Sequence, residues 1–362
     1  MSVSFDVHSS LRDYTVRVGH GTLQQLLAQQ PGAFVLHDAR LTQPQLRGAR
    51  AIAIEADEAK KTLATVAEVI ERLRELGANR QSSLVAVGGG IVQDVATFVA
   101  SSYMRGIHWV YLPTTLLGMV DSCLGGKSSI NVGRFKNIAG NYFPPWEIVV
   151  DTAFCDTLPA TQRIAGLCEA AKICFAARGD AFARYLELVP AASALDDAQR
   201  LGAVIELSLR TKKAFVEEDE FDRGVRLLLN FGHTFGHALE AASGFAISHG
   251  VAVGVGTLAA LELSRRIGLF AAEPPRAAQL ARHMRMLLRE VPQLPASLAA
   301  LDVDAALGAF RVDKKHRDDA YAAILVDADG QLERRLLPRT AATEAQLEAV
   351  FSDTRGLIDE IQ

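Results

Sequence analysis

Residues 85–94 read Val85-Ala86-Val87-Gly88-Gly89-Gly90-Ile91-Val92-Gln93-Asp94, an apolar strand pattern that passes through three glycines into a helical pattern. Glycines let the backbone approach a ligand closely, and the start of the helix offers free N–H groups. Such a turn can hold a pyrophosphate, so we expect a dinucleotide as partner. The spacing is not GxGxxG, and an ordinary structural turn is the alternative.

Outward from this turn, the first 150 or so residues alternate short β-branched runs with helical patterns, which predicts a largely parallel sheet. The runs cover residues 33–37, 51–54, 84–87 and 109–112. Between them, apolar residues recur every three or four positions and predict an amphipathic helix that ends near Gly77. These apolar residues are Leu63, Val66, Val69, Ile70 and Leu73.

The composition changes after Pro144-Pro145 and Pro159, where Ala- and Leu-rich helical patterns dominate to about Phe310. We therefore expect an α/β domain over residues 1–155 and a mainly helical domain over residues 156–362. Within the second domain, residues 322–326 and 332–337 flank Asp329-Gly330, which predicts a hairpin of two strands.

Composition narrows the class of protein. A chain of 362 residues that is 49% hydrophobic can bury a large core, and a net charge of -4 gives no general attraction to nucleic acid or acidic membranes. Residues 1–8 lack a basic stretch followed by an apolar one, and the weakly polar run 251–261 is too short to span a bilayer. The four cysteines show no CxxC spacing, so we expect free thiols and a cytoplasmic protein.

Two histidines suggest a metal site. His233 and His237 are four residues apart, on a helix that we expect to begin near Arg223, and so share a face. With Glu169 and His249 they could hold a divalent ion with an open coordination position. The alternative is that one or both are hydrogen-bonded core histidines, and spacing alone does not say which three groups ligate.

Several cations lie beside glycines or inside apolar segments, where a buried side chain as polar as lysine needs a partner. Each could instead be an ordinary surface charge; together they suggest an anionic substrate. They are Arg105, Lys127, Lys136, Lys172, Lys212, Arg226, Lys314 and Lys315.

Taken in order, a series of motifs across residues 33–330 resembles 3-dehydroquinate synthase, a family of the sugar-phosphate cyclase superfamily. The motifs are Glu58, Lys61-Thr62-Leu63, Gly88-Gly89-Gly90, Asp94, Tyr103-Met104-Arg105-Gly106, Pro113-Thr114-Thr115-Leu116-Leu117, Val120-Asp121-Ser122, Gly125-Gly126-Lys127, Lys136-Asn137, Glu169-Ala170-Ala171-Lys172, Arg226 and residues 230–237 (NFGHTFGH).

The resemblance implies a Rossmann-like NAD-binding α/β domain, a C-terminal helical metal-binding domain, an active site between them, and a homodimer. It implies Zn²⁺, or Co²⁺ in its place, on Glu169, His233 and His249, which leaves His237 for substrate phosphate. The residues implied for NAD are Glu58, Lys61, Gly88, Gly89, Gly90, Asp94, Thr114, Thr115, Asp121, Lys127, Lys136 and Asn137, with Asp38 after a strand as a weaker candidate.

The implied substrate is a small sugar-acid phosphate, 3-deoxy-D-arabino-heptulosonate 7-phosphate, and the implied product is 3-dehydroquinate of the shikimate pathway to aromatic amino acids. NAD would be reduced transiently and regenerated as phosphate leaves. The phosphate side would be held by Lys127, Asn137, Asn230, His237 and Lys314, with Arg105 reaching across a dimer, and the sequence leaves open whether Lys314 or Lys315 makes the phosphate contact. The carboxylate side would be held by Lys212 and Arg226. The catalytic set would be Lys127, Lys172, Lys212, Arg226, Asn230 and His237.

Some positions depart from the commonest family pattern, namely Gln93, residues 128–131 (SSIN) and residues 140–143 (GNYF). The first alternative is therefore another cyclase, of the 2-deoxy-scyllo-inosose, valiolone or aminodehydroquinate type. Arg226 and Asn230 argue against the first two, whereas the aminated substrate keeps its carboxylate. Further alternatives are a metal-dependent glycerol- or alcohol-type dehydrogenase, which would release NADH, and a catalytically silent binding protein, which would bind neither zinc nor NAD.

Overall fold

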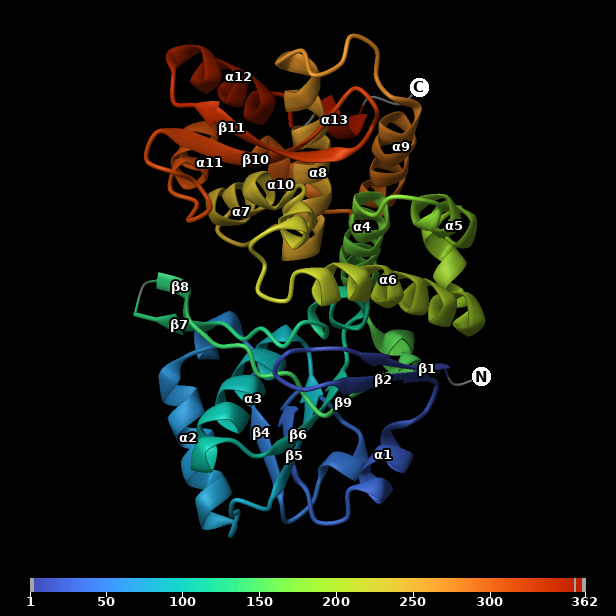
Figure 1. The fold of residues 1–362 in the computed structure, drawn as a ribbon, viewed down its shortest axis with the longest axis vertical. Helices are drawn as coiled ribbons and strands as arrows, with labels where there is room; N and C mark the ends of the chain where they lie inside the picture. Colours follow the sequence, from blue (N-terminus) through green and yellow to red (C-terminus); the bar gives the residue numbers. More distant parts are fainter. Residues whose placement is uncertain (1–2, 134, 355, 360–362) are drawn as a thin grey trace. The chain divides into compact units, whose positions relative to one another are not determined.

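The computed structural model describes residues 3–133, 135–354 and 356–359 (Figure 1). The chain divides into two compact units, Met1–Leu158 with Leu201–Glu220, and Pro159–Arg200 with Phe221–Gln362. The expected division at residue 155 placed all later residues in one domain, whereas most of α6 (Ala198–Glu218) groups with the first unit. Hydrogen bonding gives the reason: Ser208 Oγ of α6 donates to the Val120 carbonyl at 2.8 Å.

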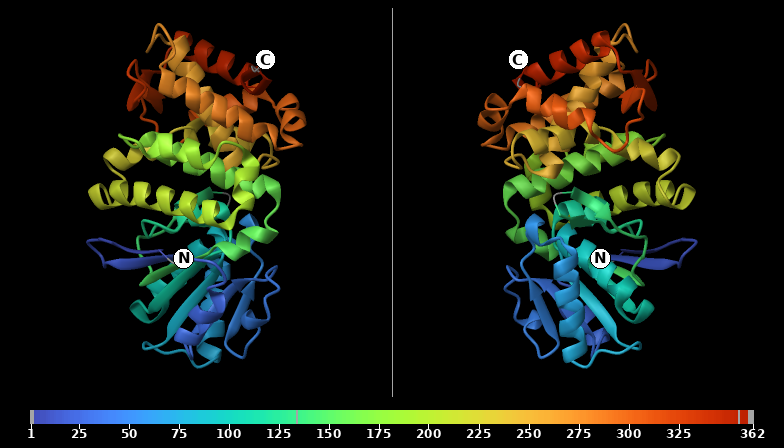
Figure 2. Two further views of the ribbon diagram at one scale, coloured as in Figure 1. Left: turned by 90° about the vertical axis from the view of Figure 1, so that its right-hand side faces the viewer. Right: turned by 90° about the vertical axis from the view of Figure 1, so that its left-hand side faces the viewer.

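The first unit is built on a seven-stranded sheet with the order β1-β2-β9-β6-β5-β3-β4. All neighbouring pairs are parallel except β1 and β2, which pair antiparallel and extend one edge of the sheet (dark blue in Figure 2). The strands are β1 (Val3–Val7), β2 (Tyr14–Gly19), β3 (Phe34–Asp38), β4 (Ala51–Ile54), β5 (Ser83–Gly88), β6 (His108–Pro113) and β9 (Glu147–Asp151). The largely parallel sheet is confirmed.

The helices of the first unit besides α6 are α1 (Leu23–Gln29), α2 (Leu63–Glu75) and α3 (Gly90–Ser102). The predicted amphipathic helix is α2, which buries Val66, Val69 and Leu73 and ends just before Gly77. Helix α3 packs on α2 and on strands β3, β5 and β6. A separate hairpin, β7 (Ile130–Val132) with β8 (Phe135–Ala139), was not anticipated.

The central strands position the predicted cofactor turn. Leu84, Val85, Ala86 and Val87 of β5 are all fully buried, as expected for a strand covered on both faces. The carboxyl end of a parallel strand is where loops gather ligand-binding groups. Gly88 ends β5 at this edge, so the glycine turn lies where a cofactor can be held.

The second unit is mainly helical, as expected, and it also contains the predicted hairpin, β10 (Ala320–Val326) with β11 (Leu332–Pro338). Gly330 has a φ of 73° in the connecting turn, a backbone conformation that favours glycine. The helices are α4 (Ala160–Ala176), α5 (Ala181–Leu188), α7 (His233–Ala242), α8 (His249–Arg266), α9 (Pro275–Arg289), α10 (Leu294–Ala299), α11 (Val303–Arg311), α12 (Ala341–Ser352) and α13 (Gly356–Asp359).

Helix α8 is the central helix of this unit and packs against α4, α7, α9 and β10. Its residues 250–261 are all buried, which explains the weakly polar run in the sequence. A Cβ on Gly256 would lie 2.1 Å from the Gly232 carbonyl oxygen, so glycine permits α8 to approach the start of α7 closely. Within the described residues, no helix is both long and apolar enough to cross a membrane.

One helix prediction is wrong. The helix that carries His233 and His237 does not begin near Arg223; a 3₁₀ turn over Val225–Asn230 precedes it, and α7 begins at His233 itself. The reason is Gly232, whose φ of 76° interrupts the helical backbone. As a result, His233 lies at the first position of its helix.

A buried histidine contributes to the core of the second unit. His283 of α9 is 7% exposed, and its Nε2 lies 3.2 Å from the Tyr185 hydroxyl, which in turn donates to the Leu167 carbonyl. Because that hydroxyl hydrogen is used by Leu167, His283 donates to Tyr185 as a neutral imidazole. Burial lowers the pKa of His283 to about 4.

His283 should make the protein sensitive to mild acid. Its pKa is about 4 when folded against 6.5 when unfolded, so the unfolded chain takes up the proton first as the pH falls below 6.5. Between pH 7.5 and 5 we expect the wild type to lose about 2 kcal/mol more free energy of unfolding than His283→Gln. Denaturant titrations of both proteins at the two pH values measure this; equal losses would contradict it.

Candidate cofactor and metal sites

The glycine turn has the geometry of a phosphate cradle. A Cβ on Gly88 would lie 2.4 Å from the Val92 side chain, so the close passage of β5 into α3 requires glycine there. Gly89 caps α3, and a Cβ on Gly90, its first residue, would have no heavy atom within 4 Å. The turn therefore leaves open space at the positive end of a helix, where an anion is favoured.

Thr114 and Thr115 follow the neighbouring strand β6 and lie beside this turn. The Thr114 backbone N–H donates to the Gly88 carbonyl at 3.1 Å, and a Cβ on Gly89 would come within 3.1 Å of Thr115 Cγ2. The structure thus brings together the glycines and threonines that the resemblance implied for NAD.

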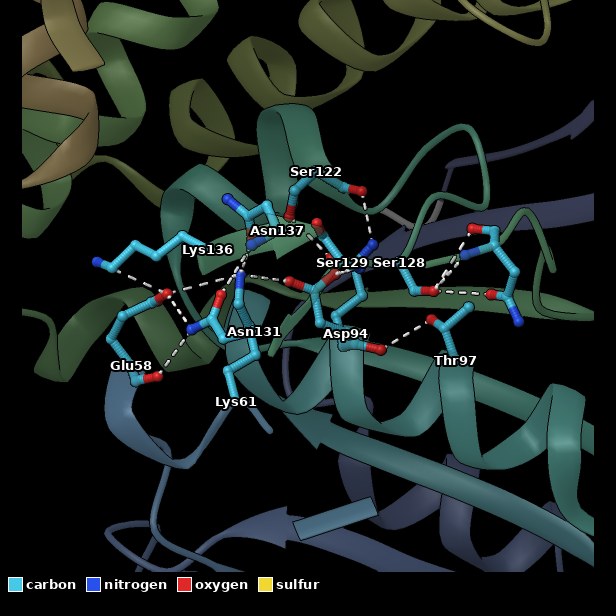
Figure 3. Close-up of polar contacts among 12 residues, drawn as sticks. Glu58, Lys61, Asp94, Thr97, Ser122, Ser128, Ser129, Asn131, Lys136 and Asn137 are labelled. Atoms are coloured by element: carbon cyan, nitrogen blue, oxygen red, sulfur yellow. Dashed lines mark hydrogen bonds and ion pairs between the residues drawn. The ribbon is translucent and has the colours of Figure 1, made fainter. Parts of the chain in front are cut away.

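An ion pair connects this turn to another part of the first unit. The Lys61 ammonium donates to Asp94 Oδ2 at 3.1 Å and to Asn137 Oδ1 at 2.6 Å, so it joins α3 to the β7–β8 hairpin (Figure 3). The backbone N–H of Ser129 donates to the other Asp94 oxygen at 3.0 Å. Burial raises the pKa of Asp94 to about 6, although Lys61 opposes the rise.

Glu58 and Lys136 lie in the same network. The Glu58 Oε1 atom is 3.9 Å from the Lys61 ammonium and 3.8 Å from that of Lys136. It also accepts a hydrogen bond from the side-chain amide of Asn131 at 2.9 Å (Figure 3). Three residues predicted for NAD therefore converge with Asn131, a residue that sequence reasoning had not assigned to the site.

Asp121 lies in a short π-helical turn, Gly118–Ser122, and is held by α6. The Lys212 ammonium is 2.7 Å from Asp121 Oδ1 and donates to the Asp121 carbonyl at 2.5 Å. Gln93, one of the departures from the family pattern, donates to the Ser122 carbonyl at 2.7 Å and accepts from the Ser122 hydroxyl at 2.8 Å. Gln93 thus supports the turn that carries Asp121.

The other candidates of the first unit have partners of their own or are exposed. Asp38 ends β3, and its carboxylate accepts from Arg40 Nε at 3.2 Å. Lys127 forms a backbone bridge with Tyr142, and its ammonium lies 6.0 Å from the centre of that ring. Arg105 is exposed, with a left-handed backbone at a φ of 68°.

In the second unit, Glu169, His233 and His249 each offer a ligand atom within 4.8 Å of the others. Glu169 Oε1 lies 3.5 Å from His233 Nε2 and 3.6 Å from His249 Nε2. Glu169 is fully buried, and its Oε1 accepts no hydrogen bond from the described residues. A buried carboxylate oxygen facing two imidazole nitrogens fits a divalent metal well.

The second nitrogen of each histidine is also occupied. His233 Nδ1 lies 3.4 Å from the Phe231 carbonyl, and His249 Nδ1 lies 2.9 Å from Glu240 Oε2. Partners of this kind keep the proton on Nδ1 and leave the Nε2 lone pair for a metal. Glu240 was not among the predicted residues, although it lies seven residues after His233 and therefore on the same helical face.

The histidine pKa values differ because their neighbours differ. Burial, reinforced by the Lys172 charge, lowers the pKa of His233 well below its usual range. Burial also lowers the pKa of His249. The hydrogen bond to Glu240 and the charges of Glu240 and Glu169 act in the opposite direction, and the net result is a raised pKa. Lys172 itself is buried one turn after Glu169 and forms an ion pair with its Oε2.

His237 faces a different partner. Its Nδ1 lies 3.4 Å from Asp313 Oδ2, and Asp313 is in turn 3.8 Å from the Lys315 ammonium. His237 also forms a second possible ligand group with Glu240 and His249. In that group His249 Nδ1 lies 2.9 Å from Glu240 Oε2, whereas the buried Glu169 oxygen faces Nε2 of both His233 and His249.

The remaining candidates of the second unit are Asn230, Arg226 and the lysine pair Lys314 and Lys315. Asn230 and Lys315 line a cavity of about 110 Å³ with Thr234 and Arg334. Arg226 is 3% exposed, whereas Lys314 is exposed. The charge of Lys315 also contributes to the lowered pKa values of His233 and His237.

Comparisons with known proteins agree with the motifs. Residues 51–165 match the family description "3-dehydroquinate synthase N-terminal", and residues 166–316 match "3-dehydroquinate synthase C-terminal". A 3-dehydroquinate synthase from Nitrobacter winogradskyi is 38% identical over 358 residues, which cover 91% of this chain and 91% of the relative.

Solved structures share the fold. A 2-deoxy-scyllo-inosose synthase complexed with carbaglucose-6-phosphate, NAD⁺ and Co²⁺ is 25% identical, with a TM-score of 0.83 over 96% of this chain and 100% of that one. A 2-epi-5-epi-valiolone synthase from Streptomyces hygroscopicus, with NAD⁺ and Zn²⁺ bound, has a TM-score of 0.77 at 24% identity over 96% and 98%. With its two matched segments and its alignment to a relative over nearly the whole length, the chain belongs to the 3-dehydroquinate synthase family.

Proposed function

We propose that this chain converts 3-deoxy-D-arabino-heptulosonate 7-phosphate to 3-dehydroquinate and phosphate, with NAD and a divalent metal, Zn²⁺ or Co²⁺, as cofactors. The observation that carries the proposal is the buried Glu169 carboxylate facing Nε2 of His233 and His249 within a chain of this family. When bound, the metal would supply a Lewis acid for a substrate hydroxyl and NAD would accept and return a hydride.

The chain's own residues would bind and orient the reactants. The Gly88–Gly90 turn and α3 offer backbone N–H groups to a cofactor pyrophosphate, while Glu58, Lys61 and Asp94 offer side chains for its hydroxyl groups. Asp121, fixed by Lys212, would lie toward the reacting end of the cofactor. This assignment follows the family motif residue by residue.

The substrate phosphate would be bound by neutral and cationic donors. In the second unit Asn230, His237 and Lys315 are the candidates, and in the first unit Lys127 and Asn137. Because Asp313 lies at His237 Nδ1, it keeps that nitrogen protonated and directs Nε2 to the ligand. We propose Lys315 in place of Lys314, which is exposed.

The substrate carboxylate would pair with Arg226 and Lys212. A guanidinium can bind a carboxylate through two parallel hydrogen bonds, and burial strengthens such a pair. A cyclase acting on a sugar phosphate without a carboxylate has no use for a buried arginine at this position. The presence of Arg226 therefore supports a sugar-acid phosphate as the substrate, rather than a sugar phosphate without a carboxylate such as a 2-deoxy-scyllo-inosose synthase would use.

We further infer a cytoplasmic homodimer that supplies the shikimate pathway. Cys123, Cys155, Cys168 and Cys174 are all buried and form no disulfide with one another, which suits a reducing compartment. Arg105 is exposed and would reach the phosphate of the partner subunit's substrate.

The first test is turnover by the purified protein with NAD and Zn²⁺. We expect phosphate release from 3-deoxy-D-arabino-heptulosonate 7-phosphate, 3-dehydroquinate by mass spectrometry, and no accumulation of NADH. Glucose 6-phosphate, the parent sugar of the analogue bound in the solved relative, is the comparison substrate. Phosphate release from glucose 6-phosphate alone would identify a different cyclase, and accumulating NADH would identify a dehydrogenase.

Arg226→Lys tests carboxylate recognition. Lysine keeps the charge but loses the bidentate geometry, so we expect KM for the substrate to rise about tenfold or more. Arg184→Lys, at an exposed arginine of α5, is the matched control and should leave KM unchanged. An unchanged KM in Arg226→Lys would place the carboxylate elsewhere.

Glu240→Ala tests the support of His249. Without the Glu240 carboxylate the imidazole loses the partner of its Nδ1, so we expect Kd for Zn²⁺ to rise about 10- to 100-fold. Calorimetric titration of the metal-free protein with Zn²⁺ measures Kd directly. Glu348→Ala, at an exposed glutamate of α12, controls for loss of a charge; equal affinity in both variants would exclude the role of Glu240.

A further inference from the structure

We propose that Asn131 is a positioning residue that holds the β7–β8 hairpin against the turn containing Glu58 and Lys61, and so orients Glu58 and Asn137 for their ligands. The inference rests on the proposed function, because it takes Glu58 as a cofactor contact and Asn137 as a phosphate contact. Neither the family motifs nor the departures from them assign such a role to Asn131.

The backbone of Asn131 already joins two elements. Its N–H donates to the Lys61 carbonyl at 2.8 Å, and it forms an isolated parallel bridge with Thr62, the cap of α2. The register of the β7–β8 pair shifts between Ile130 and Val132, so Asn131 is an irregular position in the hairpin. A bulge of this kind redirects a side chain out of the regular ladder.

The Asn131 side chain uses both ends of its amide. Its Nδ2 donates to Glu58 Oε1 at 2.9 Å and lies 3.2 Å from the Glu58 carbonyl, and its Oδ1 accepts from the Asn137 backbone N–H at 2.9 Å (Figure 3). These partners decide the amide orientation, because the Glu58 oxygens only accept and the Asn137 N–H only donates. Aspartate lacks the donor, and alanine lacks both groups.

The bond to Asn137 stabilises an uncommon backbone conformation. Asn137 has a φ of 54°, in the left-handed region that non-glycine residues seldom adopt. In this conformation its Oδ1 lies 2.6 Å from the Lys61 ammonium, which is also bound to Asp94. Without the Asn131 acceptor, Asn137 would lose the contact that offsets its backbone strain.

The contacts form a closed ring of side chains. Asn131 joins Glu58 to Asn137, Asn137 joins Lys61, and Lys61 lies 3.9 Å from Glu58. Asn131 is 9% exposed, so water competes little for these hydrogen bonds. A cofactor contact and a phosphate contact thus depend on one amide.

The test measures NAD affinity by calorimetry, without turnover, in Asn131→Ala and Asn131→Asp. We expect Kd for NAD to rise about tenfold in Asn131→Ala, the loss that corresponds to a hydrogen bond to a charged group. Asn131→Asp should weaken binding further, because it places a second carboxylate beside Glu58. Val132→Ala, at the exposed neighbouring residue, is the matched control and should change Kd less than twofold.

A double-mutant cycle separates positioning from general loss of structure. In the double variant Asn131→Asp/Glu58→Gln, the glutamine amide at position 58 can donate to the aspartate carboxylate at position 131. The hydrogen bond is then kept with its donor and acceptor exchanged. We therefore expect the rise in Kd caused by Asn131→Asp to be at least threefold smaller in the Glu58→Gln background than in the wild type. Equal penalties in the two backgrounds would overturn the inference, even if Asn131→Ala proves unstable.

The outcomes also distinguish this inference from the proposed function. If the wild type binds no NAD, the proposed function fails. If the wild type binds NAD and Asn131→Ala binds it equally well, the positioning role fails while the proposed function stands.

Discussion

The buried Glu169 carboxylate is the constraint on which the second unit depends. A fully buried charge is costly unless cations or a metal compensate it, and here Lys172 and two imidazoles surround it. The three elements involved, α4, α7 and α8, must therefore pack closely at this point. Small residues permit this approach, as Gly256 of α8 does against the backbone of Gly232.

The first unit uses the same physical principle with different groups. Lys61 is 7% exposed, and its charge is matched by Asp94 while Asn137 supplies a neutral acceptor. Through these two contacts Lys61 connects α3 to a hairpin distant in sequence. Burial of paired charges thus gives each unit a preorganised polar cluster, in which the side chains are oriented before a ligand arrives.

The local sequence pattern predicted helices and strands correctly where the apolar residues recur with a clear period. Examples are the apolar spacing of α2, the apolar runs of β3 to β6, and the Asp329-Gly330 turn. Each depends on residues that are neighbours in the chain, so the sequence was sufficient to predict the element. The predicted start near Arg223 was wrong because a left-handed Gly232 interrupts the helix. The hairpin β7–β8 was missed because its strands are short and depend on contacts with residues 58–62.

By itself, the sequence determined the family, the order of an α/β part before a mainly helical part, and the identity of the motif residues, because these properties lie in contiguous segments. Only the tertiary structure decided which atoms face one another. Examples are the side of each imidazole that faces Glu169, the partners Glu240 and Asp313, and the contact of Asn131 with Glu58. Each joins distant segments or depends on side-chain direction. Hydrogen bonds and ion pairs depend on distance and angle in space, and spacing along the chain does not specify these between separate elements.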